Sequence, residues 1–229
     1  MRKKLSHKDQ YNFFKKLFIK ISRKIGFEVI DQSKFFVPTS DLKLSDNLSV
    51  FNKKNITFPL GELKVTRKID SFLVIFRSFT NENRLLSQNK KRIFEKEKKE
   101  YTYKSLQSLC DAINKCQKKI PGIKFFLKVI DDNSSTLVVN NLKKIVKKYK
   151  IKNEISSLDV AKYENKMKFK NNKRMVAHNA HIFDSKLYAK NSNYDLIFFA
   201  EDDYLHQNNS ITEMIYSYQK LSTILNDEI

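Results

Sequence analysis

Acidic side chains follow two short apolar runs of the chain, at the points where the runs stop. Runs of four to eight apolar residues that end at polar residues are typical of buried strands in a parallel sheet. Ligands of open α/β sheets bind just beyond the carboxyl ends of such strands. Neighbouring carboxylates repel one another unless a cation or a hydroxyl-rich ligand shares their charge. The acids in question are Asp131, Asp132, Glu201, Asp202 and Asp203.

The consecutive acids Glu201, Asp202 and Asp203 are the candidate metal ligands. Mg²⁺ and Mn²⁺ prefer hard oxygen ligands, and proteins typically hold them through one or two carboxylates together with substrate phosphates. Carboxylates that follow the apolar run 196–200 supply such oxygens. The sequence therefore predicts a Mg²⁺ or Mn²⁺ site at this strand end.

A basic loop follows a third apolar run, at residues 72–76. We expect its arginines, Arg77 and Arg84, to face the acids, because the carboxyl ends of parallel strands lie along one edge of a sheet. Arginine neutralises phosphate charge, whereas carboxylates accept hydrogen bonds from ribose hydroxyls. The three strand ends together suit a nucleoside diphosphate, with Ser134 as a further hydroxyl beside the first acidic pair.

The elements that must position these residues alternate between strand and helix. Apolar runs are separated by segments with helical periodicity. This alternation is typical of an α/β fold with a mostly parallel sheet flanked by helices. The predicted strands are 72–76, 125–130, 155–160 and 194–200. The predicted helices are 106–116, 137–149, 171–190 and 210–225.

The chain divides into an N-terminal extension, 1–69, and an α/β domain, 70–229. The pattern over 1–27 predicts a basic amphipathic helix, with apolar side chains three and four residues apart. Two placements fit such a helix: on an anionic membrane, or docked on the domain with its lysine face in solvent. The following segment, 28–69, predicts a connector with a strand or hairpin arm around 63–69.

The composition is that of a folded, strongly basic protein. Of the 229 residues, 41% are hydrophobic and 31% are charged, which argues against a disordered chain. The formal net charge of +20 suits a polyanionic partner, although a general bias towards lysine and asparagine accounts for part of it. No apolar run is long enough for a transmembrane helix, and there is no secretory signal. We therefore expect a cytoplasmic protein, peripheral on the inner membrane face if its first helix contacts lipid.

Cysteines and histidines offer weaker candidates. Cys110 and Cys116 lie six residues apart in one predicted helix, point to different faces and are not expected to form a disulfide. His178 and His181 have a spacing that would let them share a metal, but such pairs more commonly have packing or surface roles. His206 follows the three acids, where it would either support the metal site or cap the next helix.

Several of these motifs resemble family 2-like glycosyltransferases with the GT-A fold, over about residues 71–225. The segment 129–134, VIDDNS, is similar to the family's VDDxS element, and 198–203, FFAEDD, is similar to its DxD-like EDD element. The two elements together, about 70 residues apart, are more specific than either alone. Further matching residues are Leu73–Phe76, Arg84 and Leu106–Leu109.

This resemblance implies the N-terminal, nucleotide-sugar-binding part of a glycosyltransferase that assembles cell-surface polysaccharide or lipid-linked glycan. Asp131 and Asp132 would hold the base and ribose of a nucleotide-diphosphate sugar donor. Asp203, helped by Asp202 and Glu201, would hold the metal on the diphosphate. The metal would act as a Lewis acid on the leaving group while a hydroxyl of the glycan or lipid-linked acceptor attacks the anomeric carbon. The nucleotide-sugar-binding set is Arg77, Arg84, Asp131, Asp132, Ser134 and Asp202.

The chain departs from this family's pattern in two places. The family's acceptor-binding half and general base normally lie well beyond the EDD element, whereas this chain stops at Ile229, one predicted helix later. We therefore expect a fragment truncated on its acceptor side, and no residue is assigned as the general base. The loop 77–80, RSFT, also lacks the family's usual Pro-Thr-Tyr-Asn pattern.

The alternative is a basic protein that binds nucleic acid or a membrane surface without catalysis. A nucleic-acid-binding protein would use lysine for phosphate contacts and aromatic side chains for stacking. Arginine is scarce, however, and the aromatic residues concentrate in predicted core strands. Nucleic-acid binding also leaves the acids at two strand ends unexplained, so it is the less favoured function. The membrane alternative rests on the N-terminal helix alone.

Overall fold

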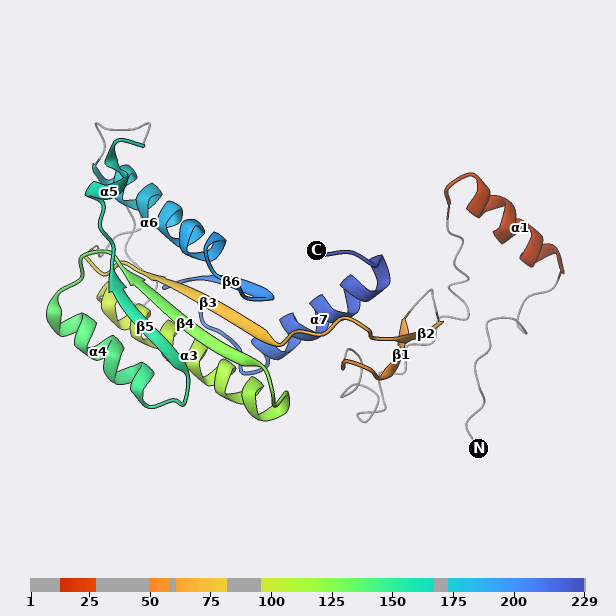
Figure 1. Cartoon of the computed structure of the whole chain (residues 1–229), viewed down its shortest axis with the longest axis horizontal. Helices are drawn as coiled ribbons and strands as arrows, with labels where there is room; N and C mark the ends of the chain where they lie inside the picture. Colours follow the sequence, from red (N-terminus) through yellow and green to blue (C-terminus); the bar gives the residue numbers. More distant parts are fainter. Residues whose placement is uncertain (1–12, 28–49, 58–60, 82–95, 167–172, 229) are drawn as a thin grey trace. The chain divides into compact units, whose positions relative to one another are not determined.

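The chain folds into two compact units, one of residues 69–215 and one of residues 1–68 together with 216–229. Within the part of the chain that the structure describes, no helix is long and apolar enough to cross a membrane. The structure is a computed structural model of the whole chain (Figure 1), and the residues it describes are 13–27, 50–57, 61–81, 96–166 and 173–228.

The unit 69–215 contains a four-stranded, all-parallel sheet flanked by helices, which confirms the predicted α/β class. Its strands are β3 (Ser71–Ser78), β4 (Lys124–Asp131), β5 (Lys152–Ser157) and β6 (Leu196–Glu201). Across the sheet their order is β5-β4-β3-β6, so the chain adds two strands on one side of β3 before it crosses to the other side. The strand order therefore reverses between β3 and β6, which is where ligands of open α/β sheets commonly bind.

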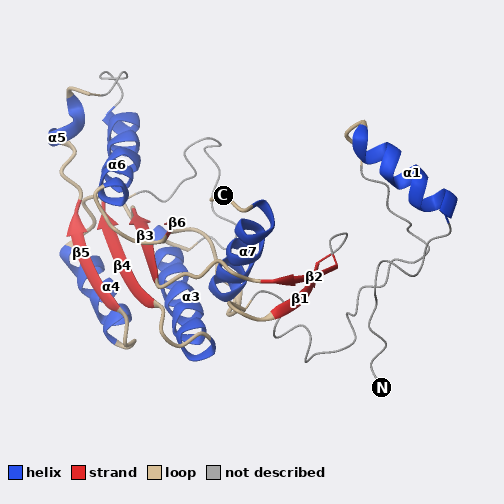
Figure 2. Ribbon diagram, turned by 45° about the vertical axis from the view of Figure 1, so that its right-hand side comes forward, coloured by secondary structure: helices blue, strands red, loops and turns tan. Residues whose placement is uncertain are grey.

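Helices cover both faces of this sheet. They are α3 (Lys98–Lys119), α4 (Thr136–Lys147), the short α5 (Ala161–Glu164), α6 (Lys173–Lys190) and the start of α7 (Ser210–Leu225). Figures 1 and 2 show α3 and α4 on one face and α6 on the other. The Ser135 hydroxyl caps the N-terminus of α4 by accepting a hydrogen bond from the Val138 amide at 3.4 Å. Gly122, at a φ of 104°, turns the chain between α3 and β4.

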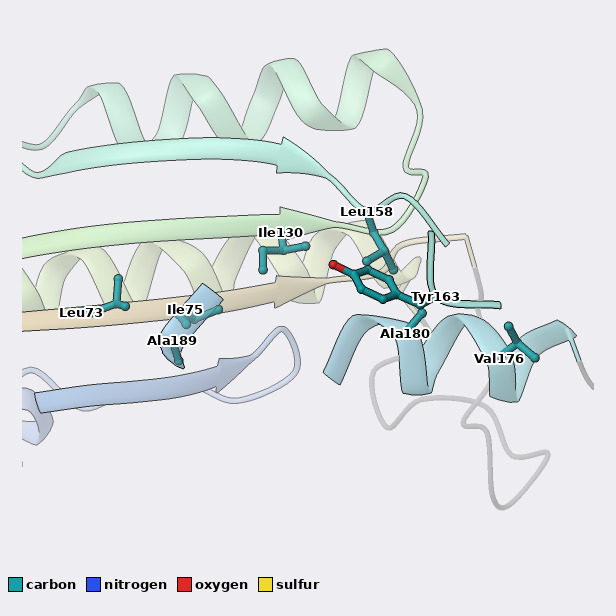
Figure 3. Close-up of a cluster of buried hydrophobic side chains, with 8 residues drawn as sticks. All are labelled: Leu73, Ile75, Ile130, Leu158, Tyr163, Val176, Ala180 and Ala189. Atoms are coloured by element: carbon teal, nitrogen blue, oxygen red, sulfur yellow. The ribbon is translucent and has the colours of Figure 1, made fainter. Parts of the chain in front are cut away.

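The central strands are buried on both faces because helices cover both. Residues 72–76 of β3 are all inaccessible to solvent. Their side chains alternate between the faces, and on the α3 side Phe72 packs against Phe125 with ring centroids 5.6 Å apart. On the α6 side, β3 and β4 meet residues from α5, α6 and the loop after β5 (Figure 3). This cluster is Leu73, Ile75, Ile130, Leu158, Tyr163, Val176, Ala180 and Ala189.

The other unit contains an antiparallel hairpin, β1 (Lys54–Thr57) and β2 (Gly61–Lys64), and the helix α1 (Phe13–Lys24). The hairpin lies earlier in the chain than the strand arm predicted around 63–69. The end of α7 belongs to this unit, and the hydroxyl of Thr223 accepts hydrogen bonds from the amides of Thr66 and Arg67 at 3.2 and 3.1 Å.

Most of the predicted elements are confirmed, with shifts at their ends. The largest shift concerns the helix predicted at 106–116, because α3 begins at Lys98, eight residues earlier. The strand predicted at 155–160 is also displaced, because β5 begins and ends three residues earlier. Leu158 follows the strand and is buried in the α6-side cluster, while its amide donates to the Asp131 carbonyl at 2.7 Å. Of the apolar residues that suggested a strand, Ile155 lies in β5 and Leu158 in a buried loop.

Two further predictions concern the cysteines and the first helix. Cys110 and Cys116 are free and buried thiols, as predicted. The helix predicted over 1–27 is described from Phe13 to Lys24, and residues 1–12 and 28–49 lie outside the described part of the chain.

Candidate functional site

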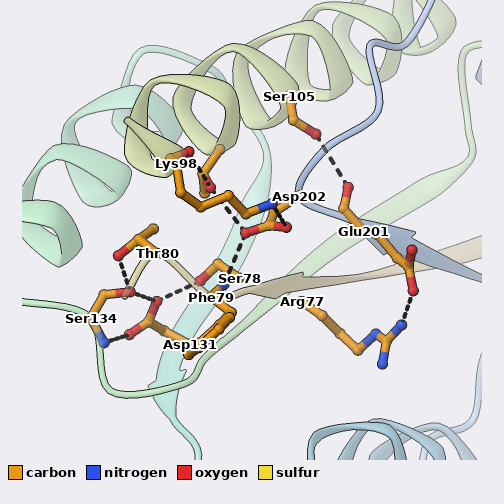
Figure 4. Close-up of polar contacts among 11 residues, drawn as sticks. Arg77, Ser78, Phe79, Thr80, Lys98, Ser105, Asp131, Ser134, Glu201 and Asp202 are labelled. Atoms are coloured by element: carbon orange, nitrogen blue, oxygen red, sulfur yellow. Dashed lines mark hydrogen bonds and ion pairs between the residues drawn. The ribbon is translucent and has the colours of Figure 1, made fainter. Parts of the chain in front are cut away.

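The carboxyl ends of β3, β4 and β6 meet at one edge of the sheet and bring the two acidic groups to the loop after β3. In the strand register Ser78 lies beside Asp131, and Arg77 lies beside Glu201. Because β3 separates β4 from β6, the acids after these two strands flank its carboxyl end. Figure 4 shows the polar contacts that result.

Asp131 is buried and joins the end of β4 to the end of β3 and to the turn before α4. Its Oδ1 accepts hydrogen bonds from the hydroxyls of Ser78 and Ser134 at 2.6 and 2.7 Å, and its Oδ2 accepts one from the Ser134 amide at 2.9 Å. The Thr80 hydroxyl in turn donates to the Ser134 hydroxyl at 2.7 Å. Both Asp131 oxygens, and the predicted ligand Ser134, are therefore engaged within the protein.

Asp132 is also buried, but it accepts a single described side-chain hydrogen bond, from the Asn133 amide group to Oδ1 at 3.1 Å. Its backbone N–H donates to the Ser78 carbonyl at 2.9 Å, which fixes the start of the turn. Burial raises the pKa of Asp132, the neighbouring charge of Asp131 raises it further, and the Asn133 hydrogen bond opposes the shift. Asp132 thus keeps hydrogen-bonding capacity that Asp131 has lost.

Asp202, predicted as both a metal and a nucleotide ligand, is buried between α3 and the loop after β3 (Figure 4). Its Oδ1 forms an ion pair with Lys98 at 2.6 Å. Its Oδ2 accepts hydrogen bonds from the Thr102 hydroxyl and the Phe79 amide, each at 2.9 Å. Burial raises the pKa of Asp202, whereas the Lys98 ammonium and the two neutral donors oppose this rise. The carboxylate therefore holds the first turn of α3 against the loop.

Sequence reasoning missed Lys98 and Thr102, which bind Asp202. Lys98 belongs to the charged segment 87–101, where most side chains would be expected in solvent. It is nevertheless only 5% exposed. Nothing in the spacing of this segment distinguishes Lys98 from its neighbours.

Glu201 and Arg77 are cross-strand neighbours that form an ion pair with each other. The Glu201 carbonyl also accepts a hydrogen bond from the Ser105 hydroxyl at 3.2 Å. Arg77 was predicted to contact phosphate, and its side chain is largely buried beside this partner. Asp203, the third acid of the group, is exposed. The other predicted arginine, Arg84, lies outside the described residues.

The predicted histidines do not converge on the acids. His181 is buried on α6, and its Nε2 lies 2.9 Å from the Ile130 carbonyl, which can only accept, so Nε2 carries the proton. Burial lowers the pKa of His181 to about 4. His178 is exposed on the same helix. The His206 ring packs edge-on against Phe198 at 5.9 Å between centroids, and burial lowers its pKa.

The metal-binding capacity of the edge is concentrated in one residue. Among the described residues, no group of three or more His, Cys, Asp and Glu side chains is placed to hold a metal ion. Asp202 has both oxygens bonded and Glu201 is paired with Arg77, so Asp203 is the best placed of the three predicted ligands. A single carboxylate fits Mg²⁺ or Mn²⁺ when phosphates and water supply the remaining ligands.

A surface hollow lies at the opposite, amino-terminal edge of the sheet, remote from these acids. It is lined by side chains of both charges, including Asp70 and Lys124. Asp195, also in its lining, has its Oδ2 bonded by the amides of Asp70 and Ser71 and by the Ser71 hydroxyl. These contacts tie the start of β3 to the residues before β6, so Asp195 has a structural role.

Comparison with known proteins gives no family for the chain. No protein-family model matches it, and neither does a curated protein or a solved structure. The argument for a function therefore rests on the side chains at the carboxyl edge of the sheet.

Proposed function

We propose that the carboxyl edge of the sheet binds the nucleoside diphosphate of a nucleotide sugar, as the donor site of a glycosyltransferase. The observation that carries this proposal is the placement of Asp132 and Asp203 after the two strands that flank β3. The strand order reverses between β3 and β6, the strand that Asp203 follows, and both carboxylates have oxygens that the described hydrogen bonds leave available.

The two carboxylates suit different parts of such a donor. Asp132, buried beside the turn into α4, suits a ribose hydroxyl or a base N–H, because a carboxylate accepts hydrogen bonds from both groups. Such hydrogen bonds are stronger in a buried site than in water. Asp203, in contact with solvent, suits the hydrated Mg²⁺ or Mn²⁺ that accompanies a diphosphate. That ion, when bound, would supply positive charge to the leaving diphosphate.

Other polar residues at the edge shape the site rather than bind the donor directly. Asp131 and Asp202 have both oxygens occupied by internal hydrogen bonds. Arg77 is paired with Glu201, so it would contribute positive charge to the site without binding the donor directly. The acceptor is a hydroxyl of a glycan or of a lipid-linked glycan, by resemblance to the family named above, and no general base is assigned.

Calorimetric titration of the whole chain with UDP and GDP, with and without Mn²⁺, tests this proposal. Removal of Asp132 or Asp203 by alanine should weaken binding by at least about tenfold, since a hydrogen bond to a charged group contributes about 1.5–3 kcal/mol. The Asp203→Ala variant should also lose the effect of Mn²⁺, whereas Asp132→Ala should keep it.

Asp227→Ala is the control for Asp203→Ala, because Asp227 is also an exposed aspartate and lies outside the unit 69–215. Its titration should equal that of the unmodified chain. Absence of binding by a folded chain, or equal binding by all three variants, would contradict the donor site. Release of UDP or GDP from their sugar conjugates in the presence of hydroxyl acceptors then measures transfer itself.

A further inference from the structure

Helix α1 presents an apolar face to solvent. The side chains of this face recur three and four residues apart and fall within an arc of about 100° on a helix. They are large, and their exposed fractions run from 45% at Leu17 to 76% at Phe14. Soluble proteins rarely leave such a contiguous apolar surface uncovered. The face consists of Phe14, Leu17, Phe18 and Ile21, with Phe13 at its margin.

The remaining directions of α1 carry lysine and arginine, together with the half-buried Ile19 and the buried Ser22. The helix contains five lysine or arginine residues and no acidic residue. Lys20, Arg23 and Lys24 are exposed, and the last two lie in the final turn, where a positive charge favours the helix dipole. An apolar face on a helix whose charged residues are all positive is complementary to a surface that is apolar inside and anionic outside.

The length of α1 restricts how it can meet a bilayer. Twelve residues extend for about 18 Å, which is well short of the hydrocarbon core of about 30 Å. The helix therefore cannot span a membrane, but it has the length, charge and apolar face of a helix that lies in the interface.

We propose that α1 docks the protein on an anionic lipid bilayer. Phe14, Phe18 and Ile21 enter the boundary between headgroups and acyl chains, while Lys20 and Lys24 remain at the level of the lipid phosphates. This proposal does not depend on the donor site, because α1 belongs to the other unit of the chain.

Two other occupants of this face fit the observations less well. A nucleic acid would pair with the lysines but would leave four or five large apolar side chains in water. A second copy of the chain would cover the apolar face but would bring two helices together that carry only positive charge. A bilayer containing anionic lipid satisfies both faces at once.

Co-sedimentation of the full chain with vesicles tests this proposal. The vesicles are of phosphatidylcholine alone and of an equal mixture of phosphatidylcholine and phosphatidylserine. We expect binding to the mixed vesicles that weakens as salt is added, and much weaker binding to the neutral ones. Circular dichroism should show a gain of helix on binding, since a helix of twelve residues is marginal in water without partners.

Two variants separate the apolar contribution from the electrostatic one. Phe14→Ser with Phe18→Ser should abolish measurable binding without changing the net charge. Lys20→Gln with Lys24→Gln should weaken it by about 25-fold, since each lysine near an anionic surface contributes about fivefold. The matched control is Lys143→Gln with Lys147→Gln, which makes the same charge change on the exposed side of α4. This control should bind nearly as the unmodified chain does.

Several results would overturn the proposal. One is a folded chain that fails to bind the mixed vesicles, and another is a control on α4 that loses as much affinity as the variant on α1.

Binding of an oligonucleotide that requires Lys20 and Lys24, without binding to vesicles, would assign the helix to nucleic acid. A dimer that Phe14→Ser with Phe18→Ser converts to a monomer, again without vesicle binding, would assign the face to a second copy. Titration with UDP or GDP should be unchanged in all of these variants, so failure here leaves the donor site standing.

Discussion

The acidic groups after β4 and after β6 lie at the same edge of one sheet, and the fold satisfies their buried carboxylates in different ways. Asp131 is bonded by the two serine hydroxyls and by a backbone amide, all neutral donors. Asp202 is bonded by the ammonium of Lys98 as well as by two neutral donors. The first group is held by neutral donors from its own turn and from the end of β3, and the second contains an ion pair to the first turn of α3.

The comparison also shows that neighbouring aspartates in each acidic group have different roles. In each acidic group one aspartate is occupied by internal contacts, while the aspartate that follows it keeps capacity for a ligand. Asp132 accepts one described side-chain hydrogen bond, and Asp203 is exposed. The lesson is that only part of an acidic motif at a strand end is available for binding, because the strand end itself needs a carboxylate to hold its loops.

The largest expected effect comes from breaking the ion pair after β6. Asp202→Ala removes the carboxylate that forms an ion pair with the buried Lys98, which should lower the free energy of unfolding by about 3–5 kcal/mol. Asp203→Ala changes an exposed side chain and should stay within about 0.5 kcal/mol. Urea unfolding followed by circular dichroism measures both. Adding Lys98→Met to Asp202→Ala should recover part of the loss, and equal stabilities of the two single variants would show that the pair is not structural.

A second expected effect concerns the histidines of α6, another pair with one buried and one exposed member. Burial lowers the pKa of His181 to about 4, so in the range between 6.5 and 4 the unfolded chain binds a proton that the folded chain does not. Stability should therefore fall with decreasing pH over this range, by about 1.4 kcal/mol per pH unit at most. His181→Gln should flatten this part of the profile, whereas His178→Gln at an exposed position should leave it unchanged. A steep profile retained in His181→Gln would assign the titration to another group.

The smallest expected effect concerns Asp132, whose effect on the pH dependence of stability is opposite in sign to that of His181. Burial raises the pKa of this carboxyl above 3.8, so the folded state holds the proton more tightly than the unfolded state does. Its contribution to stability is complete below pH 3.8 and is lost as pH rises through the folded pKa. Asp132→Asn should therefore be more stable than the unmodified chain at neutral pH, and the two should converge in acid. An equal or lower stability of Asp132→Asn at pH 7 would mean that the carboxylate is needed by the fold.

The fold was predicted best at the central strand of the sheet and at the last helix. The strand predicted at 72–76 and the helix predicted at 210–225 are observed as β3 and α7, with matching or nearly matching ends. The edge strand β5 was displaced, because its sequence KNEISS carries polar side chains that an edge strand tolerates, while the apolar Leu158 lies in a buried loop. Periodicity alone does not distinguish an apolar residue in a strand from one buried in a loop.

The candidate site was predicted only in outline. The acids after the strands could be recognised in the sequence as candidate ligands, since apolar runs that stop at carboxylates recur at 130–132 and 200–203. Their separate roles were not visible, and the assignment of Asp202 and Glu201 as metal ligands that help Asp203 did not include the partners that the fold supplies. Arg77 likewise looked like a phosphate ligand because its neighbour Glu201 is 124 residues away in the chain.

The amino-acid sequence by itself determined the alternation of strands and helices, the buried central strands and the amphipathic character of α1. These properties depend on the spacing of apolar residues along a short segment, which is local information. Only the tertiary structure decided which carboxylates remain available, because Asp202 is occupied by a lysine 104 residues before it. Pairing of that kind depends on how α3 packs beside β6, and no local pattern records it.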